Sequence, residues 1–272
     1  MTAPILKNGT ESIIEHFIAE KLRKTGAKGY VLGVSGGIDS AVVLRLAVEA
    51  VGKEKVLALI MPEKDSPRGD LEDATMLCEL EGVQHRIIDI SDAVESFSRA
   101  VGTKIDRGGL ANIKARCRMI LLYHFAGKDK RLVLGTSNKS EMLIGYFTKH
   151  GDGGVDLEPI GDLYKTEVRQ LAKALGIPEK IIGRAPSAGL WPGQTDEKEI
   201  GMSYEDLDSV LLTIELGLDS NVAIERTGVS KDKIDRVVKM VRSSSHKRKV
   251  PAVVKIGLRT PGLDWREGDE DL

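Results

Sequence analysis

The chain has 272 residues, of which 41% are hydrophobic and 30% are charged. That length and balance suit one large α/β domain with its own core, and they exclude a disordered or fibrous chain. The formal net charge of −1 predicts no general attraction to nucleic acid, because such attraction depends on clustered positive charge.

The sequence shows no signal for membrane insertion or for a disulfide-stabilised fold. Charged residues interrupt the apolar residues of the amino-terminal stretch, and no segment approaches the roughly 20 apolar residues that cross a bilayer. We therefore expect no membrane contact and a cytoplasmic location. Cys78 and Cys117 stand 39 positions apart without a CxxC partner, so we expect buried thiols rather than a disulfide or a zinc site.

Helices and short strands alternate through the first half of the chain. Apolar residues at helical spacing predict helices, and short apolar runs predict buried parallel strands. In chain order we expect a helix at 10–25, a strand at 30–34, a helix at 39–51, a strand at 56–61, a helix at 70–82, a strand at 85–90, helices at 91–101 and 108–127, a strand at 132–135 and a helix from about 138. This order implies right-handed crossovers and a doubly wound, mostly parallel, Rossmann-like α/β sheet.

The pattern changes after Gly161. We expect a helix at 163–175, a polar stretch rich in Gly, Pro and Ser at 183–201, and helices at 203–217, 220–227 and 231–243. We interpret residues 1–272 as a single α/β domain with a helical part at about 200–250 and a flexible acidic tail at 266–272.

A glycine-containing loop joins the first predicted strand to the next helix. It comprises Gly33, Val34, Ser35, Gly36, Gly37, Ile38, Asp39 and Ser40. Unpaired N–H groups at a helix start attract anions, and adjacent glycines let the backbone approach a phosphate closely. Asp39 would repel a bare phosphate, so its presence indicates a Mg²⁺ ion between the two.

This loop is not a Walker A loop, because the Lys-Ser/Thr ending is absent. It resembles the SGGxDS loop of the N-type ATP pyrophosphatases. That resemblance implies cleavage of ATP between its α and β phosphates and adenylation of a substrate. The alternative interpretation is a glycine turn that only packs a helix against a strand.

A second group of polar residues follows the fourth predicted strand. Glu141 lies on a helix soon after the strand end, and a glycine-rich turn then carries Lys149, Asp152 and Asp156. Glu141 could complete a Mg²⁺ site with Asp39 and phosphate oxygens, since magnesium takes few protein carboxylates. Taken singly, each of these residues is more often an ordinary surface group.

Together with SGGIDS, the segments GTSNKSE and GYFTKHGDGG are similar to the ammonia-dependent NAD synthetase family, and the resemblance extends to about Pro251. It implies that Mg²⁺ is held by Asp39 and Glu141. The implied ATP contacts are the loop 33–40, Thr136, Lys165 and Ser187, where Ser187 replaces the Thr of many relatives. The implied deamido-NAD contacts are Arg116, Lys149, Asp156, His246 and Lys247.

The resemblance implies amidation of deamido-NAD by ammonia, with ATP activating the nicotinate carboxylate as an adenylate and with AMP and pyrophosphate released. Lys165 would neutralise the departing pyrophosphate. Either Asp152 or Asp156 would accept the proton of ammonium. The stretches Lys64–Gly69 and Ser187–Gly201 would close over the site and exclude water.

The family also implies a homodimer, with helices 10–25 and 108–127 as candidate interface elements. The short segment before the first strand leaves no amidase domain, so free ammonia is the expected donor. Two alternatives remain open. The chain could be another ATP pyrophosphatase, such as the ATPase subunit of a GMP synthetase or a tRNA-thiolating enzyme, or it could be a nucleotide-binding regulator without turnover.

Overall fold

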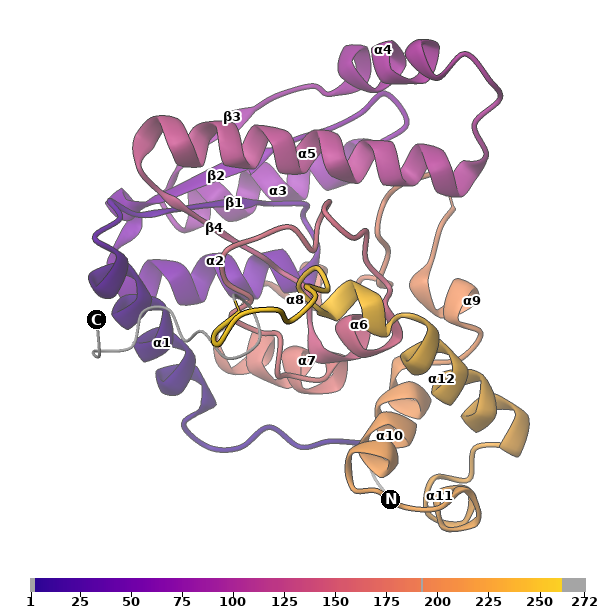
Figure 1. Ribbon diagram of the computed structural model, residues 1–272. Helices are drawn as coiled ribbons and strands as arrows, with labels where there is room; N and C mark the ends of the chain where they lie inside the picture. The colour runs from indigo at the N-terminus through magenta and orange to yellow at the C-terminus, as the bar shows by residue number, and fades with distance from the viewer. Residues whose placement is uncertain (1–2, 192, 261–272) are drawn as a thin grey trace.

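The computed structural model describes residues 3–191 and 193–260, and a sheet of parallel strands lies at its centre (Figure 1). The strands are β1 (Tyr30–Gly33), β2 (Val56–Ile60), β3 (Gln84–Ile87) and β4 (Leu132–Leu134). Their spatial order is β3-β2-β1-β4, and every pairing is parallel. The predicted doubly wound parallel sheet is therefore confirmed.

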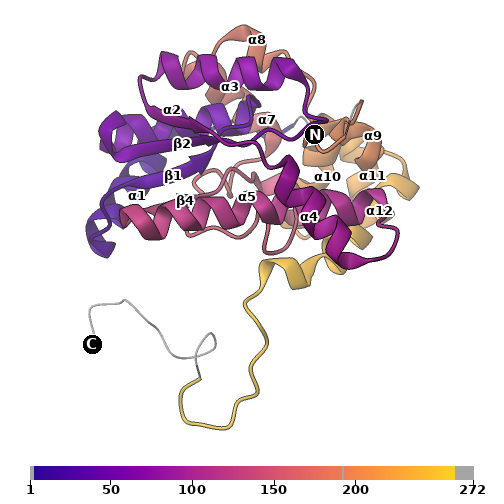
Figure 2. The same cartoon turned by 90° about the horizontal axis from the view of Figure 1, so that it is seen from above.

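Helices cover both faces of the sheet (Figure 2). The helices of the first half are α1 (Thr10–Thr25), α2 (Ile38–Val51), α3 (Arg68–Leu80), α4 (Ser91–Val101) and α5 (Arg107–Asp129). Alternate residues of a strand point to opposite faces. Leu32 accordingly packs in the core with α1, α2 and α3, whereas Val31 packs in the core with α4 and α5.

The second half of the chain adds short helices around one end of the sheet. They are α6 (Lys139–Ile144), α7 (Lys165–Ala174), α8 (Glu179–Ile182), α9 (Asp196–Ile200), α10 (Tyr204–Glu215), α11 (Ser220–Thr227) and α12 (Lys231–Ser243), with two 3₁₀ turns at Lys53–Lys55 and Ser245–Arg248. The helices α10, α11 and α12 share a small apolar core with Ile144 of α6 and with Tyr164. They therefore pack directly against the segment that follows β4.

The structure differs from the predicted elements in a few places. The third strand ends at Ile87 instead of residue 90. Beyond it, Ile88 N still donates to Ile60 O at the end of β2, and Ile90 N donates to Pro62 O, two residues after β2. The polar stretch 183–201 contains α9, whose five residues end at Gly201 in the left-handed region. Such a short helix gives little periodic signal. The predicted tail 266–272 lies outside the described residues.

Both cysteines are buried and unbonded, as expected. Among residues 3–191 and 193–260, we find no helix with the length and apolar character that a membrane span requires.

The topology brings the two polar segments together. β1 and β4 are neighbours, but β2 and β3 lie on the far side of β1. From β1 the chain passes to β2 on one side, and from β3 it returns to β4 on the other side of β1. The strand order therefore reverses between β1 and β4, and such a switch point makes a crevice at the carboxyl ends of the strands. The loop after β1 and the start of α6 after β4 both open into this crevice.

Candidate functional site

The loop between β1 and α2 is a preformed curl of backbone. Gly36 adopts a φ of +81°, and a Cβ on it would lie 2.7 Å from the carbonyl oxygen of Asp70. Both facts require glycine. Ser35 Oγ accepts from Gly37 N at 3.2 Å, and Ser40 Oγ donates to Gly37 O at 2.9 Å. The serines therefore fix the curl from inside, and the first N–H groups of α2 open toward the cleft.

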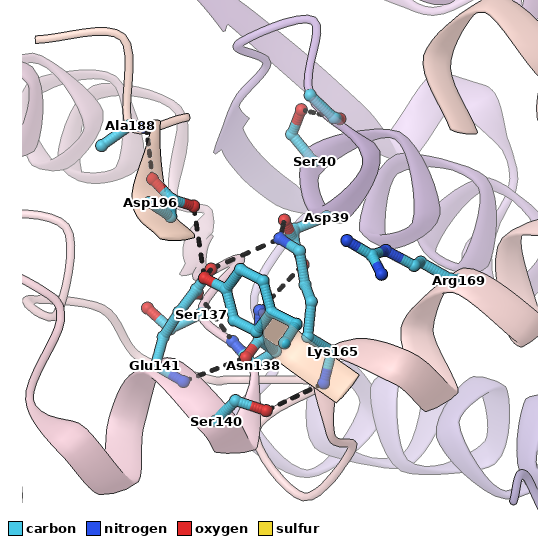
Figure 3. A network of polar contacts seen from close by, with 12 residues as sticks. Asp39, Ser40, Ser137, Asn138, Ser140, Glu141, Lys165, Arg169, Ala188 and Asp196 are labelled. Carbon is cyan, nitrogen blue, oxygen red and sulfur yellow. Dashed lines mark hydrogen bonds and ion pairs between the residues drawn. The ribbon is translucent and has the colours of Figure 1, made fainter. Parts of the chain in front are cut away.

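Three charged side chains from distant parts of the sequence meet beside this loop (Figure 3). Lys165 Nζ forms an ion pair with Asp39 and lies 3.4 Å from Glu141 Oε1. The Lys165 residue is only 2% exposed, so its ammonium is held almost entirely by these two carboxylates. The sequence analysis assigned all three residues to the site, and they are in contact here.

Asn138 links the two carboxylates through its side chain. Its Nδ2 donates to Asp39 Oδ1 at 3.0 Å, and its Oδ1 accepts from Glu141 N at 3.0 Å. Glu141 Oε2 accepts in turn from Asn138 N at 3.2 Å. This is a capping box at the start of α6. The cap therefore fixes the direction of Glu141 and joins it to Asp39 in the first turn after the glycine curl.

Burial and charge alter the titration of this group. Burial raises the pKa of Glu141, although the charge of Lys165 opposes the shift. Burial disfavours the charged form of Lys165, but the carboxylates of Asp39 and Glu141 outweigh it and raise the pKa of Lys165. The lysine is thus a permanent cation in this environment, and the carboxylates need a positive partner.

The charges and donors of these residues suit a divalent ion. Two carboxylates converge on one buried position that a cation already occupies, and oxygen donors of this kind are preferred by Mg²⁺. Within the described part of the chain, no three His, Cys, Asp or Glu side chains form a complete metal cage. A pair of carboxylates beside a helix start whose N–H groups attract anions instead suits magnesium that keeps water and anionic ligands.

A cleft of about 510 Å³ opens in front of these groups, a size typical of small-molecule sites. Most residues assigned to ATP line it. They are Gly33, Val34, Ser35, Gly37, Ile38, Asp39, Ser40, Thr136, Lys165 and Ser187, together with Glu141, Asp152 and Lys247 from the other assignments. Gly36 faces away, against α3.

The residues assigned to deamido-NAD are more scattered. Lys149, Asp156 and Lys247 line a second, adjoining cavity of about 380 Å³. Arg116 is exposed on α5 and donates to Lys149 O at 3.1 Å. His246 is exposed in the turn after α12 and lines neither cavity.

Lys247 lies where the two cavities meet. Its Nζ donates to the carbonyls of Gly145 and Phe147 at 2.7 and 2.6 Å. An ammonium has three N–H donors, so one remains for a ligand. The neighbouring Arg248 donates instead to carbonyls at the end of α6, including Met142 O and Leu143 O. Arg248 therefore holds the 3₁₀ turn Ser245–Arg248 against the end of α6.

The two candidate proton acceptors have different surroundings. Asp152 lines the main cleft, and its Oδ1 accepts from Thr148 N at 2.9 Å. The residue is exposed at the mouth of the cleft, and the protein atoms around its carboxylate raise its pKa. Asp156 lines the second cavity and is tied to Val133 N and Tyr123 Oη.

The described loop residues 183–191 and 193–195 form one wall of the cleft and are held at several points. Lys114 Nζ, buried on α5, donates to Leu190 O at 3.0 Å and to Glu63 Oε2 at 2.8 Å. Arg184 forms ion pairs with Asp70 and Asp73 of α3. Lys114 Nζ also lies 3.6 Å from Asp65 Oδ2, so through Asp65 and Leu190 it links the stretches Lys64–Gly69 and Ser187–Gly201 that the sequence analysis expected to cover the site.

Several site residues escaped the sequence analysis. Asp196 lines the cleft, and Asn138 donates to Asp39 beside it. Their residue types are common at helix caps and on surfaces, so the sequence did not single them out. Arg118 lines the cleft near Asp152, and its Nε donates to Met61 O at 3.0 Å. Burial lowers the pKa of Arg118. Arg118 lies two residues after Arg116 and so on a different face of α5, and only its place in the helical period could have indicated from the sequence that it faces the cleft.

Comparison with known proteins gives one consistent result. The family model described as NAD synthase matches residues 11–251. The NH(3)-dependent NAD(+) synthetase of Methanosarcina mazei is 48% identical over 254 residues, which covers 92% of this chain and 99% of that protein. The corresponding protein of Archaeoglobus fulgidus is 50% identical, covering 90% and 97% of the two chains.

Solved structures agree with these sequence matches. The NMN synthetase of Francisella tularensis superposes with a TM-score of 0.82 at 36% identity, covering 91% of this chain and 98% of that chain. The NH3-dependent NAD synthetase of Campylobacter jejuni gives a TM-score of 0.78 at 34% identity, covering 90% and 97%.

Proposed function

The chain belongs to the NAD synthase family, and from this premise we propose that its cleft catalyses the ATP-dependent amidation of deamido-NAD by ammonia, a carbon–nitrogen ligation. One observation carries the proposal. Asp39 and Glu141, 102 positions apart in the sequence, converge on a single cation site beside the glycine curl that follows β1. This arrangement suits a magnesium–nucleotide complex.

The reaction begins with activation of the substrate carboxylate. A nicotinate oxygen attacks the α-phosphorus of ATP, a new P–O bond forms, and the bond to the β-phosphate breaks. The N–H groups of the loop 33–40 and the ammonium of Lys165 stabilise the charge on the departing pyrophosphate. Magnesium, when held by Asp39 and Glu141, supplies further neutralisation of that charge.

Ammonia then attacks the activated carbonyl carbon, the C–O bond to AMP breaks, and the amide of NAD forms. Ammonium must first lose a proton. We assign that proton to Asp152 rather than to Asp156, because Asp152 lines the main cleft while Asp156 is bound to Val133 N and Tyr123 Oη beside the second cavity. A raised pKa of Asp152 favours proton uptake.

The remaining substrate contacts are part of the same proposal. The second cavity, with Lys149, Asp156 and Lys247, would take the dinucleotide where it leaves the main cleft. Arg116 and His246 are exposed and lie outside both cavities. Their assignment to deamido-NAD therefore depends on a homodimer, in which a second copy would complete the binding surface. The cytoplasmic location is likewise proposed on the family resemblance.

The test is a direct product analysis. The protein is incubated with ATP, Mg²⁺, ammonium and deamido-NAD, and the products are identified by mass spectrometry. We expect NAD, AMP and pyrophosphate in equal amounts. Formation of ADP, or of AMP only with a different acceptor such as xanthylate or tRNA, would contradict the proposal, and no turnover with any acceptor would favour a regulator.

A second substrate belongs in the same assay, because one structural relative is an NMN synthetase. The deamidated mononucleotide is supplied in place of deamido-NAD. A kcat/KM higher for the mononucleotide would move the assignment to that substrate, whereas a preference for the dinucleotide would support a role for the second cavity.

A further inference from the structure

Helix α10 lies behind the starts of α6 and α7, on the side away from the cleft. It contributes two buried side chains one turn apart, Tyr204 and Asp208, and both residues are 0% exposed. Residues four apart lie on the same face of a helix. Neither of them lines the cleft, so neither can touch a nucleotide directly.

Asp208 connects the first turns of α6 and α7. Its Oδ1 accepts from Ser140 Oγ at 2.5 Å, and its Oδ2 accepts from Thr166 N at 2.8 Å. Ser140 Oγ in turn accepts from Lys165 N at 2.9 Å. Helix starts have N–H groups without partners inside the helix. One carboxylate therefore satisfies or orients donors immediately beside Glu141 and Lys165 in the sequence.

Tyr204 contacts Glu141 and Lys165 at the ends of their side chains, whereas Asp208 acts on the backbone beside them. Its hydroxyl lies 3.2 Å from Asp196 Oδ2 and 3.5 Å from Glu141 Oε1, and Lys165 Nζ lies 5.3 Å from the centroid of its ring. Figure 3 shows Glu141, Lys165 and Asp196 grouped in this network, with Ser140 at the backbone of the same two helices.

We propose that Tyr204 and Asp208 are positioning residues, which fix the spacing between Glu141 and Lys165 that the adenylation step requires. The inference deepens the proposed function and rests on it. Asp208 sets the relative position of the two helix starts, and Tyr204 sets the direction of the two charged groups. The helical part that contains α10 is thus a component of the active-site scaffold.

The need for such a support follows from the local structure. α6 has only six residues, and a helix so short has little stability of its own. The backbone bond between Lys139 N and Leu163 O, at 2.8 Å, also joins the two segments near Asp208, but it precedes both functional side chains. A displacement of about 1 Å at a reacting group can lower a rate by about 100-fold.

A simple buried carboxylate would give a different result from a positioning residue. Loss of a purely structural Asp208 lowers the free energy of unfolding but leaves kcat of the folded enzyme unchanged. Loss of a positioning Asp208 lowers kcat at saturating substrate, because the misplacement persists in the folded, fully loaded enzyme. The split between kcat and KM therefore separates the two roles.

The experiment compares Asp208→Asn, Ser140→Ala, the double variant and Tyr204→Phe. Asp206→Asn is the matched control, since Asp206 lies on the same helix but faces Lys233 of α12 at 3.7 Å. We expect kcat to fall about 10- to 100-fold in Asp208→Asn and Ser140→Ala. The double variant should lose no more than the worse single one, because both changes break the same chain of bonds.

Tyr204→Phe keeps the ring under Lys165 and removes the hydroxyl near Glu141. We expect a smaller loss of kcat, about 3- to 10-fold, with a higher Mg²⁺ concentration for half-maximal rate. Asp206→Asn should stay within about twofold of the wild type. Unchanged kcat in folded Asp208→Asn, or multiplicative losses in the double variant, would overturn the proposal.

Two controls keep the test decisive. Near-UV circular dichroism confirms the fold of each variant; if Asp208→Asn does not fold, Ser140→Ala and Tyr204→Phe decide the outcome by the same criteria.

If the wild type makes no NAD, the proposed function fails on its own. Calorimetric titration with Mg²⁺ and a non-hydrolysable ATP analogue then tests the positioning: weaker binding in Ser140→Ala supports it, and equal binding overturns it.

Discussion

Replacing Lys165 by Met isolates the buried charge group at the centre of the cleft. Methionine keeps most of the volume of the lysine stem, so the change removes a charge without opening a large cavity. Asp39 and Glu141 then face each other without the cation that now lies between them. Because Lys165 is only 2% exposed, water cannot easily take its place.

The size of the effect follows from the geometry. At the 3.4 Å between Lys165 Nζ and Glu141 Oε1, an effective dielectric constant of about 20 gives an attraction of about 5 kcal/mol. Breaking a buried ion pair by removing one partner costs about 3–5 kcal/mol in measured cases. We therefore expect the variant to lose about 3–5 kcal/mol of unfolding free energy in the absence of divalent ions.

Magnesium should recover much of this loss in the variant. A divalent ion bound by Asp39 and Glu141 would replace the missing positive charge. A ligand at a concentration of about 100 times its dissociation constant stabilises a folded protein by about 2.7 kcal/mol. In the wild type, Lys165 competes for the same two carboxylates. Mg²⁺ without nucleotide should therefore stabilise the variant more than the wild type.

The assay is urea unfolding of both proteins, with and without Mg²⁺. Lys139→Met is the matched control, because its ammonium also pairs with two carboxylates, of Asp162 and Glu215 at 3.1 and 2.9 Å, whose side chains are 97% and 47% exposed. Such solvent-exposed pairs contribute about 0–1 kcal/mol. Equal stability of Lys165→Met and wild type, or equal responses to Mg²⁺, would refute a shared cation site.

Three further predictions follow from other parts of the site. Gly36→Ala should weaken ATP binding and lower the unfolding free energy by more than about 1–2 kcal/mol, because a Cβ would lie 2.7 Å from Asp70 O at a φ of +81°. Gly102→Ala is the control, since Gly102 has a φ of +69° with open space around it and should show the backbone cost alone. Equal losses of unfolding free energy in the two variants would contradict the close approach of Gly36 to Asp70. Burial raises the pKa of Asp208 from 3.8 to about 6, so the wild type should gain up to about 3 kcal/mol of stability over Asp208→Asn as the pH falls from about 6 to about 4; a difference in urea stability that is constant with pH would contradict this. A protease of broad specificity, such as proteinase K, should cleave the loop 183–195 more slowly when ATP and deamido-NAD are bound, and equal rates would show that the loop does not close over them.

The sequence was most informative about the loop after β1 and about the order of helices and strands, because both depend on residues close together in the chain. The adjacent glycines before Asp39 predicted a tight loop after β1, and Gly36 adopts a left-handed conformation there, but its close contact is with α3 and not with the cleft. The alternation of helices and strands predicted the parallel sheet, and the sheet order then brings the ends of β1 and β4 together. Glu141 was a candidate from its place after the fourth strand, Lys165 was assigned through family resemblance, and the contact between them is a property of the fold.

The supporting residues could not be predicted in the same way. Asn138 bonds to Asp39 across 99 positions of sequence, and Asp208 bonds to Ser140 across 68. Their residue types fit a helix cap and a helix surface, so only the folded arrangement of α6, α7 and α10 reveals what they contact. The short helix α9 was missed because five residues show no clear helical period.

The central claim is that the substrate carboxylate is activated by transfer of AMP, and isotope transfer tests it most directly. Deamido-NAD is prepared with a heavy oxygen isotope in its nicotinate carboxylate and converted with ATP, Mg²⁺ and ammonium, and the AMP is then analysed by mass spectrometry. We predict one labelled oxygen in the AMP phosphate, since the carboxylate oxygen that attacks the α-phosphorus leaves with AMP when ammonia attacks the carbonyl carbon. AMP without label, formed together with NAD, would contradict the account.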